Sequence, residues 1–252
     1  VITSEIIING YGSTISRNSG DNFRILAIIA PGKLTINNLT IKDGYSTDNF
    51  YGGGGIINLD GKLFVNDSIV SNNSALIGGG AGIWAGDGSS TLLFRTSLLN
   101  NNSGAGVSIS SGGAFVKRGS GSFKVTESIL SNNYARTIGG AIYSNSSGEI
   151  VIEYTEISNN VTGDPWSAIY NYSGNITVSN SCIFANTPYA IINHASTLIS
   201  AQSNFWGHAS GPSGDGPGTG DSVSSNVDFA NWLDACPPPP PPGPSPTPTP
   251  TP

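Results

Sequence analysis

The feature that most constrains the fold of this chain is a short apolar string that the sequence repeats. The segments SIVSNN (68–73), SILSNN (128–133) and EISNN (156–160) are nearly the same, and looser copies occur before, between and after them. Successive copies are spaced about 22 to 31 residues apart. One active site does not require such repetition, whereas a stack of similar units does. The sequence therefore predicts a solenoid.

Each copy contains two columns of apolar residues that alternate with polar ones. The first column is Ile8, Ile36, Val65, Phe94, Val125, Ile152 and Val178, closed by Ser200. The second column lies five residues further on and is Ile41, Val70, Leu99, Leu130, Ile157, Ile183 and Phe205. Short alternating runs rich in Val, Ile and Phe are typical of β-strands. We expect a strand at each column in every copy.

A third apolar run, preceded by glycines, lies between consecutive pairs of columns. Clear examples are GGGGIIN (52–58), GGGAGIW (78–84), SGGAFV (111–116) and GGAIY (139–143). No stretch has the periodicity of a helix. Three short strands in each repeat predict an all-β fold, a right-handed three-sided parallel β-helix (a solenoid) of about seven to eight rungs. We place this domain at residues 1–235, with a C-terminal capping segment at residues 204–233.

Asparagines recur three residues after the second apolar column. They are Asn73, Asn102, Asn133, Asn160 and Asn186. In a parallel coil these residues would stack at the strand spacing of about 4.8 Å, and each side-chain amide would bond to the amide of the next rung. Asn also tolerates the left-handed backbone of a tight corner. The column predicts a buried structural ladder and not a catalytic site.

The composition is that of an extracellular β-rich protein. Of the 252 residues, 37% are hydrophobic and only 10% are charged, so Ser, Thr, Asn and Gly must cover the surface. The formal net charge of −6 argues against a nucleic-acid partner. No apolar run approaches the ~18 residues of a membrane-spanning helix. Cys182 and Cys236 form either one disulfide bond or two free thiols.

The repeats resemble those of a known group of bacterial surface proteins. GGAF (112–115) and GGAI (139–142), paired with Val70-x-x-Asn73 and Leu130-x-x-Asn133, are similar to the repeat pair of chlamydial polymorphic outer-membrane proteins. More broadly, they resemble the right-handed parallel β-helix repeats of bacterial surface proteins, and residues 204–233 are similar to the terminal segment of many of these. The resemblance implies an adhesin-like or secreted protein and does not specify a ligand.

The two ends of the sequence suggest part of a longer extracellular chain. The sequence has no starting Met and no signal peptide, and it opens directly into the apolar run EIIING (5–10). Residues 236–252, CPPPPPPGPSPTPTPTP, are expected to adopt extended polyproline structure at about 3.1 Å per residue. We interpret them as a Pro/Thr-rich linker towards further domains or a cell-surface anchor, with a disordered tail as the alternative.

Ionisable residues that could support catalysis are scattered. Enzymes of this fold that cleave acidic polysaccharides need two or three carboxylates on one rung, or a basic residue beside calcium-binding carboxylates. The candidates are Asp67, Arg95, Glu127, Glu153 and Glu156. Asp67 and Glu127 share a column but lie two rungs apart, roughly 10 Å. We assign no catalytic residue, and a polysaccharide lyase or glycoside hydrolase is the alternative function.

No metal site is assigned from the histidines, because His194 and His208 lack a nearby cluster of further ligands. The loop GDGPGTGD (214–221) contains Asp215 and Asp221 with many backbone carbonyls, so calcium is the one candidate cofactor. Such a loop also serves as a cap, because the strand edges at the open end of a coil otherwise recruit neighbours.

A column of large side chains, one residue beyond the centre of the third strand, is the best candidate binding surface. The column is Ile57, Trp84, Val116, Tyr143, Tyr170 and Ile192. Strand alternation points these side chains outward if their neighbours face the core, and Tyr172 shares the face of Tyr170. Aromatic faces on a flat sheet can hold sugar rings, whose repeat of about 5 Å is near the rung spacing. Trp84, Tyr143, Tyr170 and Tyr172 are the candidate residues for binding surface glycans, and packing of the sheet is the alternative.

These patterns predict a non-catalytic module at the cell surface, adhesin-like, that binds glycans or displays other domains at a distance. A purely structural spacer is the further alternative to the enzyme.

Overall fold

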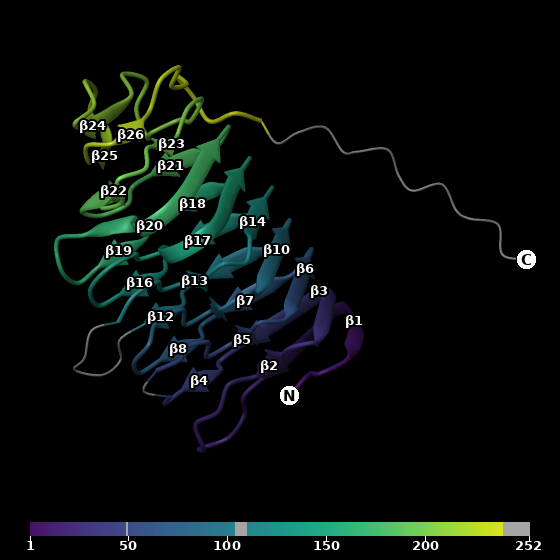
Figure 1. The fold of residues 1–252 in the computed structure, drawn as a ribbon. Helices are drawn as coiled ribbons and strands as arrows, with labels where there is room; N and C mark the ends of the chain where they lie inside the picture. Colours follow the sequence, from purple (N-terminus) through teal and green to yellow (C-terminus); the bar gives the residue numbers. More distant parts are fainter. Residues whose placement is uncertain (49, 104–109, 239–252) are drawn as a thin grey trace, which may run out of the picture.

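The computed structural model describes residues 1–48, 50–103 and 110–238. These residues form 26 β-strands and no helix, wound into a parallel β-solenoid of about 8 turns (Figure 1). No helix in this part of the chain is long and apolar enough to cross a membrane. Residues 239–252 of the predicted Pro/Thr linker lie outside the described residues. The predicted all-β parallel β-helix is confirmed.

The first face of the solenoid is a continuous ladder of parallel strands from one end to the other. Its strands are β1 (Glu5–Ser16), β3 (Lys33–Lys42), β6 (Lys62–Asn66), β10 (Ser90–Phe94), β14 (Phe123–Thr126), β17 (Ile142–Glu153), β20 (Ser167–Ser179), β23 (Ile199–Ser200) and β26 (Val227–Asp228). Alternation decides which residues face inward. In β3, for example, Leu34 and Ile36 are fully buried, while Lys33 and Thr35, which alternate with them, are only half-buried.

The second and third faces complete each turn. The second face contains the later halves of β1 and β3, then β7 (Ile69–Ser71), β11 (Ser97–Leu99), β15 (Ile129–Ser131), β18 (Glu156–Ser158) and β21 (Cys182–Phe184). The third face contains β2 (Leu26–Ile29), β5 (Ile56–Leu59), β9 (Ile83–Gly86), β13 (Phe115–Gly119), the early halves of β17 and β20, β22 (Tyr189–Asn193), β25 (Gly220–Val223) and its neighbour β24 (Pro212–Gly214). The glycine-preceded runs of the sequence are therefore strands of the third face.

Most turns contain a fourth, very short strand in addition to the three that were predicted. These strands are β4 (Tyr45–Ser46), β8 (Ser74–Ala75), β12 (Asn102–Ser103), β16 (Tyr134–Ala135) and β19 (Val161–Thr162). They form a separate parallel sheet next to the asparagine corner. Two residues are too few to show alternation, so periodicity in the sequence does not reveal them.

The apolar columns form one continuous core inside the coil. In the copy at residues 90–101 the pairing register places Leu93 and Leu98 in the columns, and both are fully buried. The predicted column residues Phe94 and Leu99 are each wrong by one residue. Residues 92–94 are consecutively apolar, so alternation alone does not decide which of them faces inward, and pairing with the neighbouring turns decides it.

Five buried asparagines stack at the corner after the second face. They are Asn73, Asn101, Asn133, Asn160 and Asn186. From Asn73 to Asn160, the backbone N–H and the Nδ2 of each donate to the Oδ1 of the next, at 3.0–3.1 Å. The same one-residue shift in the copy at residues 90–101 puts Asn101 in the ladder, so the prediction of Asn102 is corrected. The side chain of Asn102 lies outside the described part of the structure.

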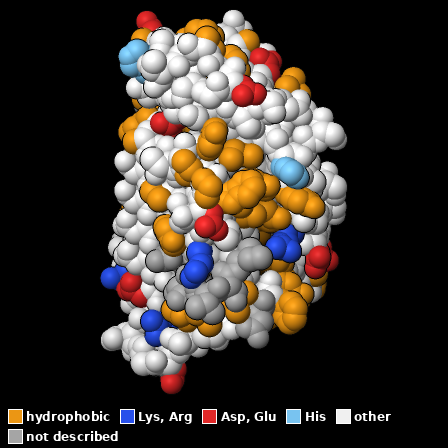
Figure 2. All heavy atoms as spheres, turned by 90° about the vertical axis from the view of Figure 1, so that its left-hand side faces the viewer, with side chains coloured by type: hydrophobic (Ala, Val, Ile, Leu, Met, Phe, Trp, Pro, Cys, Tyr) orange, Lys and Arg blue, Asp and Glu red, His pale blue; other side chains and the backbone are white. Residues whose placement is uncertain are grey.

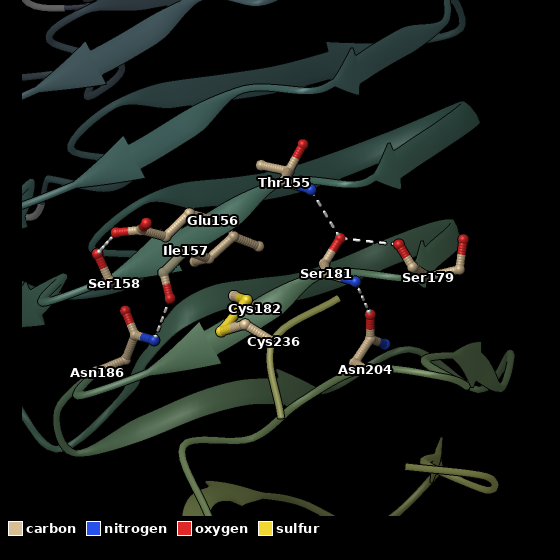
Figure 3. Close-up of a disulfide and its surroundings, with 10 residues drawn as sticks. All are labelled: Thr155, Glu156, Ile157, Ser158, Ser179, Ser181, Cys182, Asn186, Asn204 and Cys236. Atoms are coloured by element: carbon tan, nitrogen blue, oxygen red, sulfur yellow. Dashed lines mark hydrogen bonds between the residues drawn. A yellow bond between two sulfur atoms is a disulfide. The ribbon is translucent and has the colours of Figure 1, made fainter. Parts of the chain in front are cut away.

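A second ladder, of buried hydroxyl groups, runs along the corner between the first and second faces. Its members are Ser68, Thr96, Ser128, Thr155 and Ser181, closed by Asn204. At its C-terminal end the Thr155 N–H donates to Ser181 Oγ at 3.1 Å, and the Ser181 N–H donates to Asn204 Oδ1 at 2.9 Å (Figure 3). At these two corners, side chains of the next turn therefore accept hydrogen bonds from backbone N–H groups, at every step of the asparagine ladder and at several steps of the hydroxyl ladder, which keeps the buried backbone paired.

The C-terminal end of the solenoid is closed. Ala201 and Trp206 are fully buried at the end of the two core columns, one residue beyond the predicted Ser200 and Phe205. The Oδ2 of Asp221 accepts hydrogen bonds from the backbone N–H and the Nδ2 of Asn186, both at 2.9 Å, and so takes the place of the next ladder asparagine.

A disulfide ties the C-terminal segment to the second face. Cys182 in β21 is bonded to Cys236, 54 residues later (Figure 3). Of the two alternatives left by the sequence, one bond or two free thiols, the structure has the bond.

Candidate functional site

The predicted aromatic column exists in the register of the third face but is not an exposed surface. Its consecutive pairs are Ile57–Trp84, Trp84–Val116, Val116–Tyr143, Tyr143–Tyr170 and Tyr170–Ile192. The side chains lie outside the coil as a hydrophobic cluster separate from the core. Trp84, Tyr143 and Tyr170 are nevertheless only 3%, 7% and 5% exposed. The expectation of an open outward stripe is therefore corrected, because other residues cover these rings.

Glycine-rich segments pack against the column. A Cβ placed on Gly112 would lie 2.6 Å from the Cγ2 of Val116, and one on Gly53 would lie 3.1 Å from the Cβ of Ile57. Both glycines have positive φ angles, 64° and 71°, which residues with a side chain rarely adopt. The glycines that precede the third strand therefore allow the backbone to close over the column.

Aromatic side chains become exposed at the C-terminal turns of the same face. Trp166 is 38% exposed and Tyr172 is 50% exposed, and His194 is exposed beside them. The Trp166 ring meets the ring of Tyr170 edge-on at 5.4 Å between centroids. The His194 ring is nearly parallel to both tyrosine rings, at 6.3 Å from Tyr170 and 5.7 Å from Tyr172. Tyr172 therefore shares the face of Tyr170, and Figure 2 shows hydrophobic side chains gathered across the middle of this side of the molecule.

Trp166 is exposed because it replaces a glycine of the earlier turns. It lies three residues before Ile169, and Gly53, Gly80, Gly112 and Gly139 lie three residues before the equivalent positions of their turns. At this turn a large ring therefore projects where earlier turns have only backbone.

A hollow of about 350 Å³ lies beside Trp166. Trp166 and Tyr189 contribute apolar rings, and Asp215, Ser224 and Ser225 contribute polar groups. The Tyr189 N–H donates to the Trp166 carbonyl at 3.2 Å, which holds the two aromatic residues in neighbouring turns. Within the described residues the Asp215 carboxylate makes no hydrogen bond or ion pair and is exposed. The hollow combines apolar rings with polar groups, of which the Asp215 carboxylate is unengaged and the Ser224 hydroxyl already bonds to Asn193 and Ser225, and small-ligand sites likewise combine both kinds of group.

The buried tyrosines of the column remain neutral phenols. Burial raises the pKa of Tyr143, and the Arg118 guanidinium, 5.7 Å above its ring, opposes this pKa shift. Burial also raises the pKa of Tyr170, with further contributions from Tyr143 and Tyr172. These two rings therefore support the exposed aromatic residues and have no acid–base role at neutral pH.

The ionisable residues considered for catalysis are largely paired across rungs. Arg95 donates two hydrogen bonds to the carboxylate of Asp67, at 2.6 and 3.0 Å. Glu127 occupies the equivalent position in the turn after that of Arg95. Lys124 lies 3.0 Å from the Glu153 carboxylate. Charges of opposite sign in adjacent rungs are typical of surface ladders that neutralise each other.

One groove does bring two of the predicted carboxylates together. It has a volume of about 380 Å³ and is lined by Glu127, Glu156, Tyr154 and Pro237, among others. Glu156 accepts a hydrogen bond from Ser158 Oγ at 2.6 Å. The groove lies beside the disulfide, so the C-terminal segment forms one of its walls.

The two calcium candidates have different surroundings. Asp221 is engaged by Asn186, and burial raises its pKa, whereas Asp215 is exposed in the wall of the hollow. In the described part of the chain, no group of three or more His, Cys, Asp and Glu side chains is arranged to hold a metal ion. His194 stacks on tyrosines, and His208 Nδ1 hydrogen-bonds with Ser210. Calcium at this loop stays a prediction.

Sequence reasoning did not single out Trp166 and Tyr189. A signal was present, because the late copies SAIYN (167–171) and YAIIN (189–193) lack the preceding glycines. The loss of glycine marks the turns at which the backbone no longer covers the column.

Comparisons with protein-family models, with curated proteins and with solved structures give no match for this chain. The parallel β-solenoid is consistent with a β-helix repeat protein. The more specific likeness to chlamydial repeats stays a prediction from the sequence.

Proposed function

We propose that this protein is a non-catalytic extracellular module that binds glycans at the exposed C-terminal part of its aromatic face. The observation that carries the proposal is the hollow between Trp166 and Tyr189, whose polar groups Asp215, Ser224 and Ser225 lie beside the rings. Sugars have apolar C–H faces that pack on aromatic rings and hydroxyl groups that need hydrogen-bond partners. A site for a sugar therefore needs both kinds of group in one place.

The exposed rings extend the proposed site beyond a single sugar unit. His194 lies two ring contacts away from Trp166, through Tyr170, and Tyr172 lies one contact further, against His194. A row of this kind on adjacent turns matches a chain of sugars better than an isolated small molecule, because the rung spacing of about 4.8 Å is close to a sugar repeat.

An extracellular location is supported by two features. The surface is dominated by uncharged polar residues, since only 10% of the sequence is charged. The bonded pair Cys182–Cys236 is of the kind that persists in oxidising compartments. We assign the rigid solenoid a second role in displaying the site, and the adhesin-like reading follows from binding and display together.

The test is binding to a glycan array, followed by titration of any hit by calorimetry. Trp166→Ala and Tyr189→Ala should each weaken binding by roughly fivefold or more, because stacking of one ring contributes about 1 kcal/mol or more. Tyr11→Ala is the matched control, since Tyr11 is 86% exposed at the opposite end of the stack. Equal binding by all four proteins, or no binding by wild type to any glycan, would contradict the proposal.

A polysaccharide hydrolase is the second candidate, favoured by the presence of Glu127 and Glu156 in one groove. Incubation with pectins, alginates and xylans should then release reducing ends, and Glu127→Gln should abolish the release. We expect no turnover, because we assign no catalytic residue. If neither binding nor turnover is found, the spacer alternative remains.

A further inference from the structure

Charge is divided unevenly along the axis of the solenoid. Residues 1–136 contain all ten Lys and Arg residues against eight Asp and Glu residues, a formal charge of +2. Residues 137–252 contain the other eight Asp and Glu residues and no Lys or Arg, a formal charge of −8. The turns stack in sequence order, and Figure 2 shows the Lys and Arg side chains of the aromatic face in its lower half, towards the N-terminal turns. The turns that hold the Trp166 hollow therefore present carboxylates without a Lys or Arg to neutralise them.

The hollow itself has a single charged group in its wall. Among the described residues that line it, Asp215 is the only charged one. The Asp215 carboxylate is exposed and makes no hydrogen bond or ion pair within that part of the chain. Asp164, two residues before Trp166, is also exposed. A carboxylate accepts hydrogen bonds and donates none, and its strongest partners are positively charged donors.

The aromatic rings of the hollow favour a ligand of the same charge. Trp166 is 38% exposed, and it lines the hollow together with Tyr189 and Asp215. The face of an aromatic ring attracts a cation, and Trp does so most strongly. An amino sugar has an ammonium group beside the C–H face that packs on a ring. One such unit therefore uses the rings and the carboxylate together.

We propose that the glycan bound at the Trp166 hollow has free amino groups and is a chain of protonated amino sugars such as glucosamine. This inference rests on the proposed glycan-binding function and names its ligand class. An N-acetylated sugar is neutral and gains neither the ion pair with Asp215 nor the attraction of its charge to the rings. A uronic acid or sulfated sugar brings a second anion to Asp215, and no Lys or Arg among the described lining residues compensates for it.

The test compares two ligands that differ only in their acetyl groups. Glucosamine oligomers and N-acetylglucosamine oligomers of the same length and linkage are titrated into the full chain by calorimetry. At about pH 6.5 aspartate is ionised and an amine with a pKa near ~7.7 is largely protonated. At low salt the wild type should bind the amino oligomer about fivefold or more tightly than the acetylated one. Salt at about 500 mM should reduce this preference, because exposed ion pairs are screened. Galacturonic acid oligomers should bind more weakly than both.

Two substitutions separate the charge from the ring packing. Asp215→Asn should weaken binding of the amino oligomer about two- to fivefold and leave binding of the acetylated oligomer unchanged, because only the amine pairs with the carboxylate. Trp166→Ala should weaken binding of both oligomers. Asp60→Asn is the matched control, since Asp60 is an exposed aspartate of the N-terminal half, and it should change neither affinity. Circular dichroism checks that each variant is folded.

The outcomes distinguish this inference from the function on which it rests. If the wild type binds the acetylated oligomer as tightly as the amino oligomer or more tightly, the inference is overturned and glycan binding stands. A preference for the amino oligomer that is unchanged in Asp215→Asn also overturns it. Equally tight binding of an oligolysine of the same charge overturns it too, because the hollow would then be a site for basic peptides. If no oligomer and no arrayed glycan binds, the proposed function fails together with the inference.

Discussion

Replacing Asn133 by alanine tests the asparagine ladder at its centre. Asn133 is fully buried and connects the turns on either side of it. Its Oδ1 accepts hydrogen bonds from the backbone N–H and the Nδ2 of Asn101, both at 3.0 Å. Its Nδ2 donates to the Leu98 carbonyl at 2.9 Å and to Asn160 Oδ1 at 3.0 Å. The substitution Asn133→Ala removes these four bonds at once, together with a fifth from Nδ2 to the Ser131 carbonyl at 3.1 Å.

The size of the effect depends on which groups are left without a partner. The Nδ2 of Asn101 still donates to the Val70 carbonyl, and Asn160 Oδ1 still accepts from the backbone N–H of residue 133. The backbone N–H of Asn101 loses its acceptor, and the Leu98 carbonyl loses a donor. A buried polar group left unpaired costs about 1–3 kcal/mol. We therefore expect the free energy of unfolding to fall by about 2–4 kcal/mol.

Equilibrium unfolding in urea measures this loss through the midpoint and slope of the transition. Asn175→Ala is the control, because Asn175 is an exposed asparagine in β20, and it should change stability by no more than about 0.5 kcal/mol. Hydrogen exchange at the amide of Asn101 should also accelerate in Asn133→Ala. If Asn133→Ala unfolds like the control and the Asn101 amide exchanges as in wild type, the reasoning about the ladder is wrong.

Three further substitutions test other parts of the structure. Trp84→Ala removes a ring that is only 3% exposed, so the free energy of unfolding measured in urea should fall by about 3–5 kcal/mol, while glycan binding at the Trp166 hollow is unchanged. A loss of binding without a loss of stability would contradict the packing role of Trp84. Lys117 is fully buried, and burial lowers its pKa to about 8 from 10.5, so folding releases a proton and wild-type stability should rise between pH 8 and 10.5. Lys117→Met should be more stable than wild type at pH 7 and should lack this rise; parallel urea curves at all pH values would refute the assignment. Burial raises the pKa of Asp221 above 3.8, so the folded state holds the carboxyl proton more tightly than the unfolded state, and the free energy of unfolding should fall as the pH increases above 3.8. Asp221→Asn keeps an oxygen acceptor for Asn186 and should not show that fall.

The repeat pattern was sufficient to predict the architecture. The columns headed by Ile8 and Ile41 and the glycine-preceded runs correspond to the three faces, because each buried strand must alternate in the same way to share one core. The recurrence of Asn at a constant offset likewise predicted the ladder, since a corner that repeats needs the same amide at every turn. The same logic extends to the hydroxyl ladder, whose Ser and Thr residues recur at constant offsets.

The candidate site was predicted only in part. Tyr170 and Tyr172 were identified from their positions along a strand, and both belong to the aromatic face. Their partners Trp166 and Tyr189 were missed, because they lie outside the alternating run and because the hollow also needs Asp215 from a loop 49 residues after Trp166. Contacts between a strand and a distant loop leave no periodic signal in the sequence.

The sequence by itself determined the fold class, the axis of stacking and the identity of most core residues, since these depend on a period that recurs in nearly every copy. Only the tertiary structure decided three things. These are the burial of Leu93 in place of Phe94 in the copy at residues 90–101, the burial of Trp84, and the exposure of Trp166. The physical reason is the same in each case. Alternation specifies which side of its own strand a residue faces, but pairing with neighbouring turns selects the register, and loop backbone at Gly112 and its equivalents decides whether an outward side chain meets water.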